Sequence, residues 1–419
     1  MIPTPSVVGA PVVSRRWIVV GLLFLGMVVS YIDRGNLSIA AGSIMRDFGI
    51  APDSMGMLMS AFFWTYGLFQ IPAGTLIDRV GIRWIYAFAF LTWSLASAGI
   101  AISHGATDIF ALRLLLGLAE AAGPIASMTY IRQNFDGPEQ GLPTAIYIAA
   151  QNLGPAAGSW IGSHLIESMG WRFMFGATSL GALLWLPLWL WFGPRSSPRR
   201  IKTEKPAPAT ASVGSMPLAG LLAMSSCILF ASYFWYFLLS WVPTYLTSTR
   251  GFSTTQMGSI FAIPFVVMAV VNTISGRVAD RLAARLGVLR VRVLFASVAF
   301  ASASLVLLLL VAPSQSAVLP LLIVAVTGFG IGSANFWALA QFIPPGAMVG
   351  RAVGYLNTLS QIAGALAPSI TGWILGPEKN FTVALAIAGV CPVIAAGCLL
   401  AAGPSGLAAV KKHLEPVEA

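Results

Sequence analysis

The chain has 419 residues, of which 57% are hydrophobic and only 9% are charged. A soluble globular domain carries about 25% charged residues, so this chain lacks the polar shell that a soluble enzyme or binding domain of its length would need. The formal net charge of +10 does not indicate nucleic-acid binding, because the basic residues lie in short loops between apolar segments, a pattern typical of membrane topology determinants.

Apolar runs long enough to cross a hydrocarbon layer of about 30 Å recur along the whole chain. Arg15 and Arg16 precede the first run as in a signal peptide, but the run continues into Tyr31, and we interpret it as a retained span. We expect an all-α membrane protein with twelve transmembrane helices in two pseudo-symmetric six-helix bundles. The predicted spans are 17–40, 55–77, 82–103, 107–132, 142–166, 172–193, 217–246, 255–278, 292–312, 317–342, 351–375 and 381–403.

The loops between these spans differ in their content of lysine and arginine. Eighteen such residues fall on the side that holds both termini, and four fall on the other side, namely Arg46, Arg172, Arg250 and Lys379. Positively charged loops stay in the cytoplasm. The sequence therefore predicts that both termini are cytoplasmic.

The longest loop divides the spans into two groups of six. Residues 194–216 combine several prolines with basic residues and are predicted to form a flexible cytoplasmic linker. We expect an N-terminal bundle at 1–193 and a C-terminal bundle with a short tail at 217–419. Equal halves indicate a transporter whose binding site lies between them.

A short motif supports an internal repeat. Gly74 is followed by Asp78-Arg79 after the second span, and Gly276 is followed by Asp280-Arg281 after the eighth, at the same spacing. An acid at a cytoplasmic helix end can be held by a helix N-terminus or by an arginine. We predict that Asp78, Arg79, Asp280 and Arg281 form contacts that close one face of the protein and break when it opens.

The segment from Gly74 to Arg83, Gly-Thr-Leu-Ile-Asp-Arg-Val-Gly-Ile-Arg, resembles the loop signature of the major facilitator superfamily. The resemblance extends over essentially the whole chain, with its twelve spans and central loop. The segment Gly154-Pro155-Ala-Ala-Gly158 also resembles a glycine motif of that superfamily, and this motif is often linked with exchangers. Small residues are also needed wherever helices pack closely.

Four ionisable residues fall inside predicted spans: Asp33, Arg34, Arg113 and Glu120. An ionised side chain at the bilayer centre costs at least about 2.5 kcal/mol, so these residues are expected to face an aqueous cavity and to pair. Arg113 and Glu120 are two helical turns apart and share a face, with Gly117 between them leaving room for a partner or a ligand. Asp33 and Arg34 are adjacent, so one can face the cavity while the other meets a neighbouring helix.

These residues have two interpretations. A structural ion-pair network could fix the first and fourth spans together. Alternatively, the arginines bind an organic anion, since a guanidinium matches a carboxylate, and the acids carry protons. We favour the second interpretation because each pair joins one acid that a proton can neutralise to one arginine that stays charged.

Two stretches are similar to signatures of the anion:cation symporter family, which includes bacterial galactonate, glucarate and hexuronate transporters and animal sialic acid and vesicular glutamate carriers. One runs from Tyr31 to Ser38 and the other from Arg113 to Pro124, and the end of the seventh span, Trp241 to Leu246, has a shape typical of the same family.

The resemblance implies roles for matching residues. Arg34 would hold the substrate carboxylate, Asp33 and Glu120 would carry protons, and Arg113 would be the switchable partner of Glu120. The remaining cavity-lining residues implied by similarity to sugar-acid members are Tyr31, Tyr66, Gln151, Trp337 and Asn357.

The residues independently permit part of this assignment. Tyr31 is three positions before Arg34 and so shares its face, and the amides of Gln151 and Asn357 need partners within the membrane. Those partners are either a polyol or other helices. Tyr66 and Trp337 could equally be packing or lipid contacts.

We expect proton-coupled uptake of a small organic anion, a sugar acid or related carboxylate, by rocking of the two halves, with the anion competing with Asp33 for Arg34. An exchanger or exporter using the same site is the alternative, and a membrane enzyme or sensor is a remote one. We expect no catalytic residues, metal, cofactor or nucleic-acid partner. The partners are the carboxylate, protons and lipid, and the protein is expected to be a monomer in a bacterial inner membrane.

Overall fold

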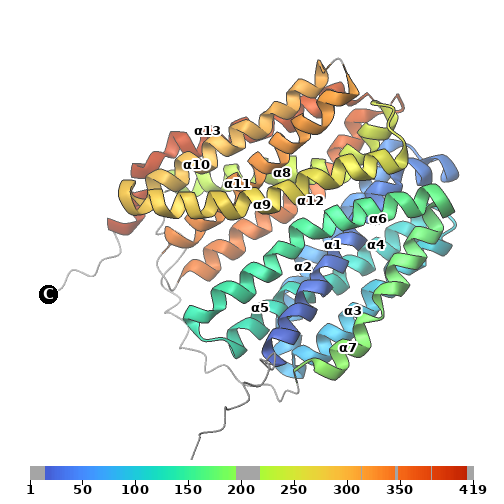
Figure 1. Ribbon diagram of the computed structural model, residues 1–419, viewed down its shortest axis with the longest axis horizontal. Coiled ribbons are helices and arrows are strands. Elements are labelled where there is room, and N and C mark those ends of the chain that lie inside the picture. The colour runs from blue at the N-terminus through green and yellow to red at the C-terminus, as the bar shows by residue number, and fades with distance from the viewer. Residues whose placement is uncertain (1–14, 195–217, 313, 345–347, 379, 413–419) are drawn as a thin grey trace, which may run out of the picture.

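Two bundles of helices make up the protein. It is described by a computed structural model covering residues 15–194, 218–312, 314–344, 348–378 and 380–412, and these ranges contain no β-strand. In Figure 1, helices α1–α7, coloured blue to green, lie together, and helices α8–α13, coloured yellow-green to red, form the neighbouring group. The prediction of an all-α membrane protein is confirmed.

The first group contains seven α-helices and two 3-10 segments. They are α1 (Arg15–Phe48), α2 (Pro52–Val80), α3 (Ile82–Gly99), η1 (Ile100–Ile102), α4 (Ala106–Glu120), α5 (Ala122–Asn134), η2 (Gly137–Gln140), α6 (Gly141–Ala182) and α7 (Trp185–Phe192).

Among the described residues, the second group contains six α-helices and two 3-10 segments named here. They are α8 (Leu218–Ser248), α9 (Thr254–Leu286), α10 (Val288–Ala303), η4 (Ser304–Leu310), η5 (Gln315–Ala317), α11 (Val318–Phe342), α12 (Val349–Leu375) and α13 (Phe381–Lys412).

The chain reverses direction within α6, at Gly170. This residue has φ 83° and ψ 165°, a backbone conformation that glycine adopts readily because it has no Cβ. Before Gly170 the chain runs parallel to α1, since Tyr147 contacts Met27 and Gly162 lies near Ile39. After Gly170 it runs antiparallel.

The antiparallel direction is shown by two indole groups. The Trp171 Nε1–H donates to Asp47 Oδ2 near the end of α1, and the Trp185 Nε1–H donates to the Leu22 carbonyl near its start. Residues 141–192 therefore make two passes, as the predicted spans 142–166 and 172–193 require.

Within the described ranges, nine helical segments are long and apolar enough to cross a membrane, and one of them, Gly137–Phe192, contains the reversal at Gly170. The α2 and α12 helices are not among the nine. Their 29 and 27 residues still exceed the roughly 20 that a membrane crossing needs. Counting these two helices and both passes of 141–192 gives the twelve predicted crossings.

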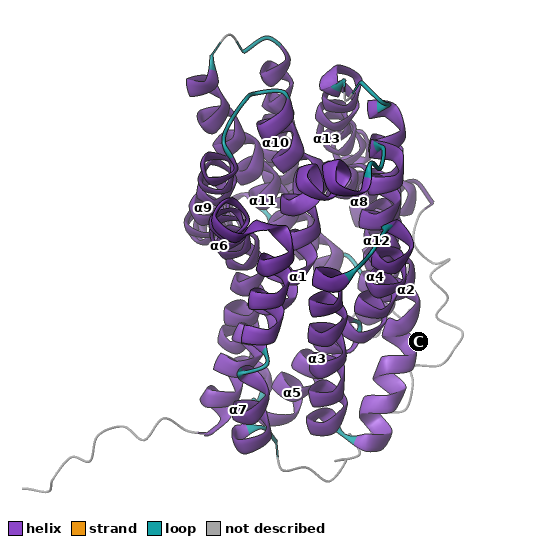
Figure 2. Ribbon diagram, turned by 90° about the vertical axis from the view of Figure 1, so that its right-hand side faces the viewer, coloured by secondary structure: helices purple, strands orange, loops and turns teal. Residues whose placement is uncertain are grey.

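The predicted domain limits at 193 and 217 stay a prediction. The predicted linker 194–216 lies outside the described residues apart from Pro194. The helices before and after it are the two groups seen in Figure 2, where α6 lies next to α9 on one side and α2 next to α12 on the other.

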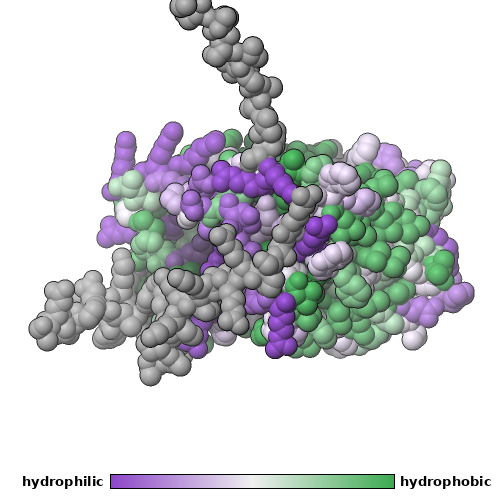
Figure 3. Space-filling view, turned by 90° about the horizontal axis from the view of Figure 1, so that it is seen from below, coloured by the Kyte–Doolittle hydropathy of each residue, from purple (hydrophilic) through white to green (hydrophobic). Residues whose placement is uncertain are grey.

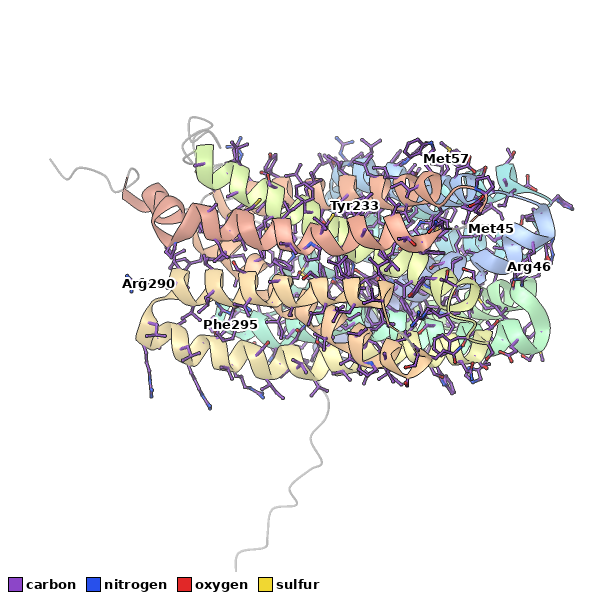
Figure 4. The ribbon with its side chains drawn as sticks, turned by 90° about the horizontal axis from the view of Figure 1, so that it is seen from above. Met45, Arg46, Met57, Tyr233, Arg290 and Phe295 are labelled. Carbon is purple, nitrogen blue, oxygen red and sulfur yellow. The ribbon has the colours of Figure 1, made fainter. Side chains whose placement is uncertain are left out.

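The surface and the ends of the molecule fit a membrane-spanning orientation. In Figure 3, hydrophobic side chains cover much of the right-hand part of the face, between hydrophilic ones at the right-hand edge and a larger hydrophilic group that extends from the left-hand end to near the middle. Arg46 and Arg290 lie at opposite ends (Figure 4). This agrees with the sequence, which predicts that their loops lie on opposite sides of the membrane. We call these ends the Arg46 end and the Arg290 end.

Contacts between the two groups of helices concentrate in the middle and toward the Arg46 end. Between α2 and α12, the Ser369 hydroxyl donates to Ser60 Oγ at 2.7 Å, and Gly372 lies against the Pro52 carbonyl. Between α6 and α9, the Thr255 N–H donates to Glu167 Oε2 at 2.7 Å. The protein is therefore closed at the Arg46 end.

Candidate functional site

A cavity lies between the two groups of helices. It takes in about 700 Å³ of space between atoms, a volume that includes open solvent at its mouth, and is lined by residues from α1, α2, α4, α6, α8 and α9. The lining residues are Tyr31, Arg34, Gly35, Ser38, Ile39, Met59, Phe63, Arg113, Pro155, Gly158, Ser159, Trp235, Tyr236, Leu239, Ser240 and Phe261.

Arg34 reaches this cavity from α1. Its Nε–H donates to Glu120 Oε2 of α4 at 2.7 Å, and the Arg34 side chain is 14% exposed while that of Glu120 is fully buried. The Ser30 hydroxyl donates to the same carboxylate oxygen at 2.6 Å, and Glu120 Oε1 has no hydrogen-bond partner. One oxygen of this carboxylate therefore accepts two hydrogen bonds, and the other accepts none from the described residues.

Three aromatic rings hold the Arg34 guanidinium. Its central carbon lies 4.9, 4.7 and 4.5 Å from the ring centroids of Tyr31, Phe62 and Tyr66. A cation this close to aromatic ring faces is attracted by the ring quadrupoles. The site thus stabilises a positive charge that hydrocarbon alone would not tolerate.

A model of the Major Facilitator Superfamily matches residues 23–368 of the sequence, and this range contains the cavity, both arginines and helices from both groups. The chain belongs to this superfamily. It is a membrane transporter, and the prediction that it is not an enzyme is confirmed.

Curated members of the superfamily resemble the chain over most of its length. The hexuronate transporter of Bacillus subtilis is 29% identical, covering 90% of this chain and 92% of its own. A probable galactarate/D-glucarate transporter of Escherichia coli is 27% identical, covering 93% and 94%. The D-galactonate transporter of another Escherichia coli strain is 26% identical, covering 86% and 89%.

Solved structures show the same fold at lower sequence identity. A bacterial homologue of the human lysosomal transporter Spinster superposes with a TM-score of 0.75 at 18% identity, covering 98% of this chain and all of that one. The D-xylose–proton symporter gives 0.74 at 16% identity, covering 92% and 97%. The predicted family and fold are confirmed.

Within this major facilitator fold, Asp33 points away from the arginine beside it in sequence. Its Oδ1 accepts hydrogen bonds from the hydroxyls of Ser97 at 2.8 Å and Ser179 at 3.2 Å, and its Oδ2 has no partner. The expectation that one of Asp33 and Arg34 faces the cavity while the other meets neighbouring helices is confirmed, with Arg34 as the cavity residue.

Arg113 is placed differently from the expectation. It lines the cavity and is 3% exposed, but the residue paired with Glu120 is Arg34 rather than Arg113. Arg113 donates one 3.4 Å hydrogen bond to the Met59 carbonyl, while its Nε and Nη1 have no partner. Sharing a helix face did not decide this pairing, because the Arg34 guanidinium reaches Glu120 from α1 at 2.7 Å.

The space beside Gly117 is occupied by the neighbouring helix α2. A Cβ at this position would meet the Phe62 carbonyl and the Thr65 hydroxyl, so the missing side chain lets α2 approach α4 closely. The prediction that this space serves a ligand or a charged partner is wrong.

Of the predicted substrate-binding residues, some lie at the cavity and others lie outside it. Tyr31 and Arg34 line the cavity, and Tyr66 lies beside it against the Arg34 guanidinium. Gln151 and Trp337 are half-buried outside its lining. Asn357 donates to Gln70 Oε1 at 3.4 Å, a contact between α12 and α2.

Several cavity residues could not be singled out from the sequence, among them Trp235 and Tyr236 of α8. Both lie in a run of aromatic residues in which every position is equally apolar. No periodicity in that run distinguishes the face that meets the cavity from the face that packs.

The predicted gate residues lie at the Arg290 end. Asp78, Arg79, Asp280 and Arg281 are all exposed. Asp280 is ion-paired with Arg292 of α10, not with its neighbour Arg281, and the Arg292 Nη1–H also donates to Asn335 Oδ1 at 2.9 Å. The two copies of the motif therefore differ, since no ion pair to Asp78 is found among the described residues.

Proposed function

We propose that this protein is a secondary active transporter that couples uptake of a small organic anion, a sugar acid or related carboxylate, to protons. The observation that carries the proposal is the buried ion pair of Arg34 and Glu120 at a cavity between the two halves. A guanidinium there is matched to a carboxylate, and the sugar acids named for the relatives all carry one.

Coupling follows from competition for Arg34. While Glu120 is ionised it occupies the Arg34 Nε–H. A proton on Glu120 removes that negative charge, and an anion can then take its place beside the arginine without adding net negative charge to a buried site. This replaces the sequence-based hypothesis of competition with Asp33, whose bonded oxygen faces Ser97 and Ser179 instead.

Asp33 serves as a second proton carrier in this proposal. Asp33 is 1% exposed, and among the described residues its hydrogen-bond donors are the hydroxyls of Ser97 and Ser179. A proton on this carboxylate would remove a buried charge that no direct ion pair offsets. The proposed role of Arg113 is to accept Glu120 in another state of the cycle.

Alternating access would occur by rocking of the two halves about the cavity. The contacts at the Arg46 end would break, and Asp78 and Arg79 would find partners across the Arg290 end, while Asp280 and Arg281 act in the second half. We place the Arg290 end and both termini in the cytoplasm of a bacterial-type inner membrane. A monomer suffices, because one chain supplies every lining residue.

Exchange of internal for external anion is the second candidate function. It is supported by Pro155 and Gly158, which belong to the glycine motif often linked with exchangers and line the cavity wall. An exchanger would use the same arginine but would not need net proton movement.

Flux into proteoliposomes tests the proposal, with radiolabelled D-glucuronate as the probe. A pH gradient, acidic outside, is expected to drive accumulation into vesicles that contain no anion substrate. Accumulation that requires internal D-glucuronate and ignores the pH gradient would establish exchange and exclude symport.

A further inference from the structure

The walls of the cavity are mainly aromatic and aliphatic. Phe63 comes from α2, Trp235 and Tyr236 from α8, and Phe261 from α9. The Phe63 and Tyr236 rings contact each other edge to face at 4.6 Å between centroids. This part of the cavity presents flat apolar surfaces contributed by both halves of the protein.

Apart from the two arginines, the polar groups in the lining are the hydroxyls of three serines and two tyrosines and one indole N–H, and several are already used. Among the described residues, no amide and no carboxylate side chain lines the cavity. The Ser38 hydroxyl donates to the Ser240 carbonyl at 2.6 Å, and the Ser159 hydroxyl donates to the Ala156 carbonyl at 3.1 Å. The amides expected to receive a polyol, Gln151 and Asn357, lie outside the lining.

This lining is poorly suited to a polyhydroxylated chain. Each polar group that is buried without a partner costs about 1–3 kcal/mol, and a six-carbon sugar acid has several hydroxyls to satisfy. An aromatic ring has no such requirement, and ring pairs contribute about 0.5–1.5 kcal/mol beyond the burial of their area.

The cavity also contains a guanidinium that forms no direct ion pair with any described residue. Arg34 is paired with Glu120, but the Arg113 guanidinium is buried, and its Nε and Nη1 have no hydrogen-bond partner. A carboxylate could accept a charge-assisted hydrogen bond from either of these donors.

We propose that the preferred substrate is a monocarboxylate with a flat, ring-bearing apolar body, and that polyhydroxylated acids are poor substrates. Its carboxylate binds at the two arginines, Arg34 and Arg113, and its ring lies among Phe63, Trp235 and Tyr236. The inference rests on the proposed function, of which it selects the related carboxylates over the sugar acids.

Binding to the purified full-length protein tests it, with two probes of equal charge, 3-phenylpropionate and D-gluconate. In titration calorimetry, 3-phenylpropionate is expected to bind at least about tenfold more tightly, a difference that corresponds to about 1.4 kcal/mol. Equal affinity, or tighter binding of D-gluconate, overturns the inference and leaves the proposed function standing. If neither carboxylate binds, both the inference and the proposed function fail.

Substitutions of Trp235 test where the ring of the bound carboxylate lies. Trp235→Ala is expected to weaken binding of 3-phenylpropionate at least fivefold and to weaken binding of D-gluconate much less, whereas Trp235→Phe retains most of the affinity for 3-phenylpropionate. The matched control is Trp373→Ala, since Trp373 is 77% exposed on α12. Equal weakening of both probes by Trp235→Ala, or no weakening of either, would contradict the assigned ring position.

Discussion

At the scale of single residues, the Arg34 guanidinium is the centre of the site. It is bonded to Glu120 and surrounded by the rings of Tyr31, Phe62 and Tyr66. The carboxylate accepts from the Nε–H edge of the planar group, while the centroids of the three rings lie 4.5 to 4.9 Å from its central carbon. A carboxylate that displaces Glu120 would therefore find the guanidinium already oriented.

Arg34→Ala is expected to abolish substrate binding, because it removes the proposed carboxylate receptor. Arg34→Lys keeps the charge but loses the planar fork, and we expect it to lower affinity by at least tenfold. Thermal shift of the purified variants with 3-phenylpropionate and D-glucuronate measures both effects. An Arg34→Ala protein that is stabilised by ligand as much as the unmodified protein would exclude Arg34 as the receptor.

Glu120→Gln is expected to uncouple transport. The amide keeps the shape of the side chain but cannot exchange a proton, so Arg34 is permanently released. Uptake driven by a pH gradient should fall to background in proteoliposomes, while exchange of labelled for unlabelled substrate continues. Proton-driven accumulation by this variant would refute the coupling role, and Ser30→Ala, which removes only the 2.6 Å hydrogen bond, is the milder comparison.

At the scale of helices, small residues allow α2 and α12 to meet at the Arg46 end. Cβ atoms at Gly56 and Gly372 would lie against the carbonyls of Pro368 and Pro52, respectively. Backbone atoms cannot turn aside as a flexible side chain can. The closed Arg46 end therefore depends on the absence of side chains at these positions.

Gly372→Ala is expected to destabilise this closed end. Overpacking typically costs about 1–3 kcal/mol, and a shift of 1.4 kcal/mol is tenfold in a population ratio. Labelling of a Ser240→Cys probe by an impermeant thiol reagent from the Arg46 side should rise about tenfold in a background lacking the native cysteines.

The matched control is Gly354→Ala on the same helix, where a Cβ would meet nothing within 4 Å. It should leave the labelling rate unchanged and add helix propensity. Equal labelling of the two alanine variants would show that the Gly372 contact does not hold this end closed.

At the scale of the whole molecule, closure at the Arg46 end and exposed acids and arginines at the Arg290 end describe one state of a two-ended protein. For transport, the contacts at the Arg46 end must break and contacts at the Arg290 end must form. Because the cavity draws residues from six helices in both groups, relative movement of the groups changes its access without dismantling Arg34 and Glu120, which both belong to the first group.

The orientation is testable with single cysteines in intact cells. Arg46→Cys is expected to react with an impermeant thiol reagent added outside, and Arg290→Cys only after the membrane is permeabilised, because positively charged loops stay in the cytoplasm. Reaction of both variants from the same side would contradict the assigned topology.

How much of this could be read from the sequence differs between the fold and the site. Long apolar runs predict helical passes well, because a membrane requires every backbone group to be bonded within the segment. Even the reversal at Gly170 fell between two predicted spans. Residue types also identified the ionisable group, since charges in hydrocarbon are costly and need partners.

Only the three-dimensional structure shows which of the ionisable residues form pairs. Arg113 shares a helix face with Glu120, yet Arg34 arrives from another helix and takes the carboxylate. Similarly, the amides of Gln151 and Asn357 could bind a polyol, but helix packing places them outside the cavity. Asn357 donates a hydrogen bond to Gln70 instead.

The sequence by itself determined that this protein crosses a membrane repeatedly, which loops carry the positive charge and which charges are buried, because those properties depend on local composition. Only the tertiary structure decided which partner each charge has and which apolar side chains surround the cavity. Those outcomes depend on how closely distant helices approach, and helix faces of similar composition give no local signal of their neighbours.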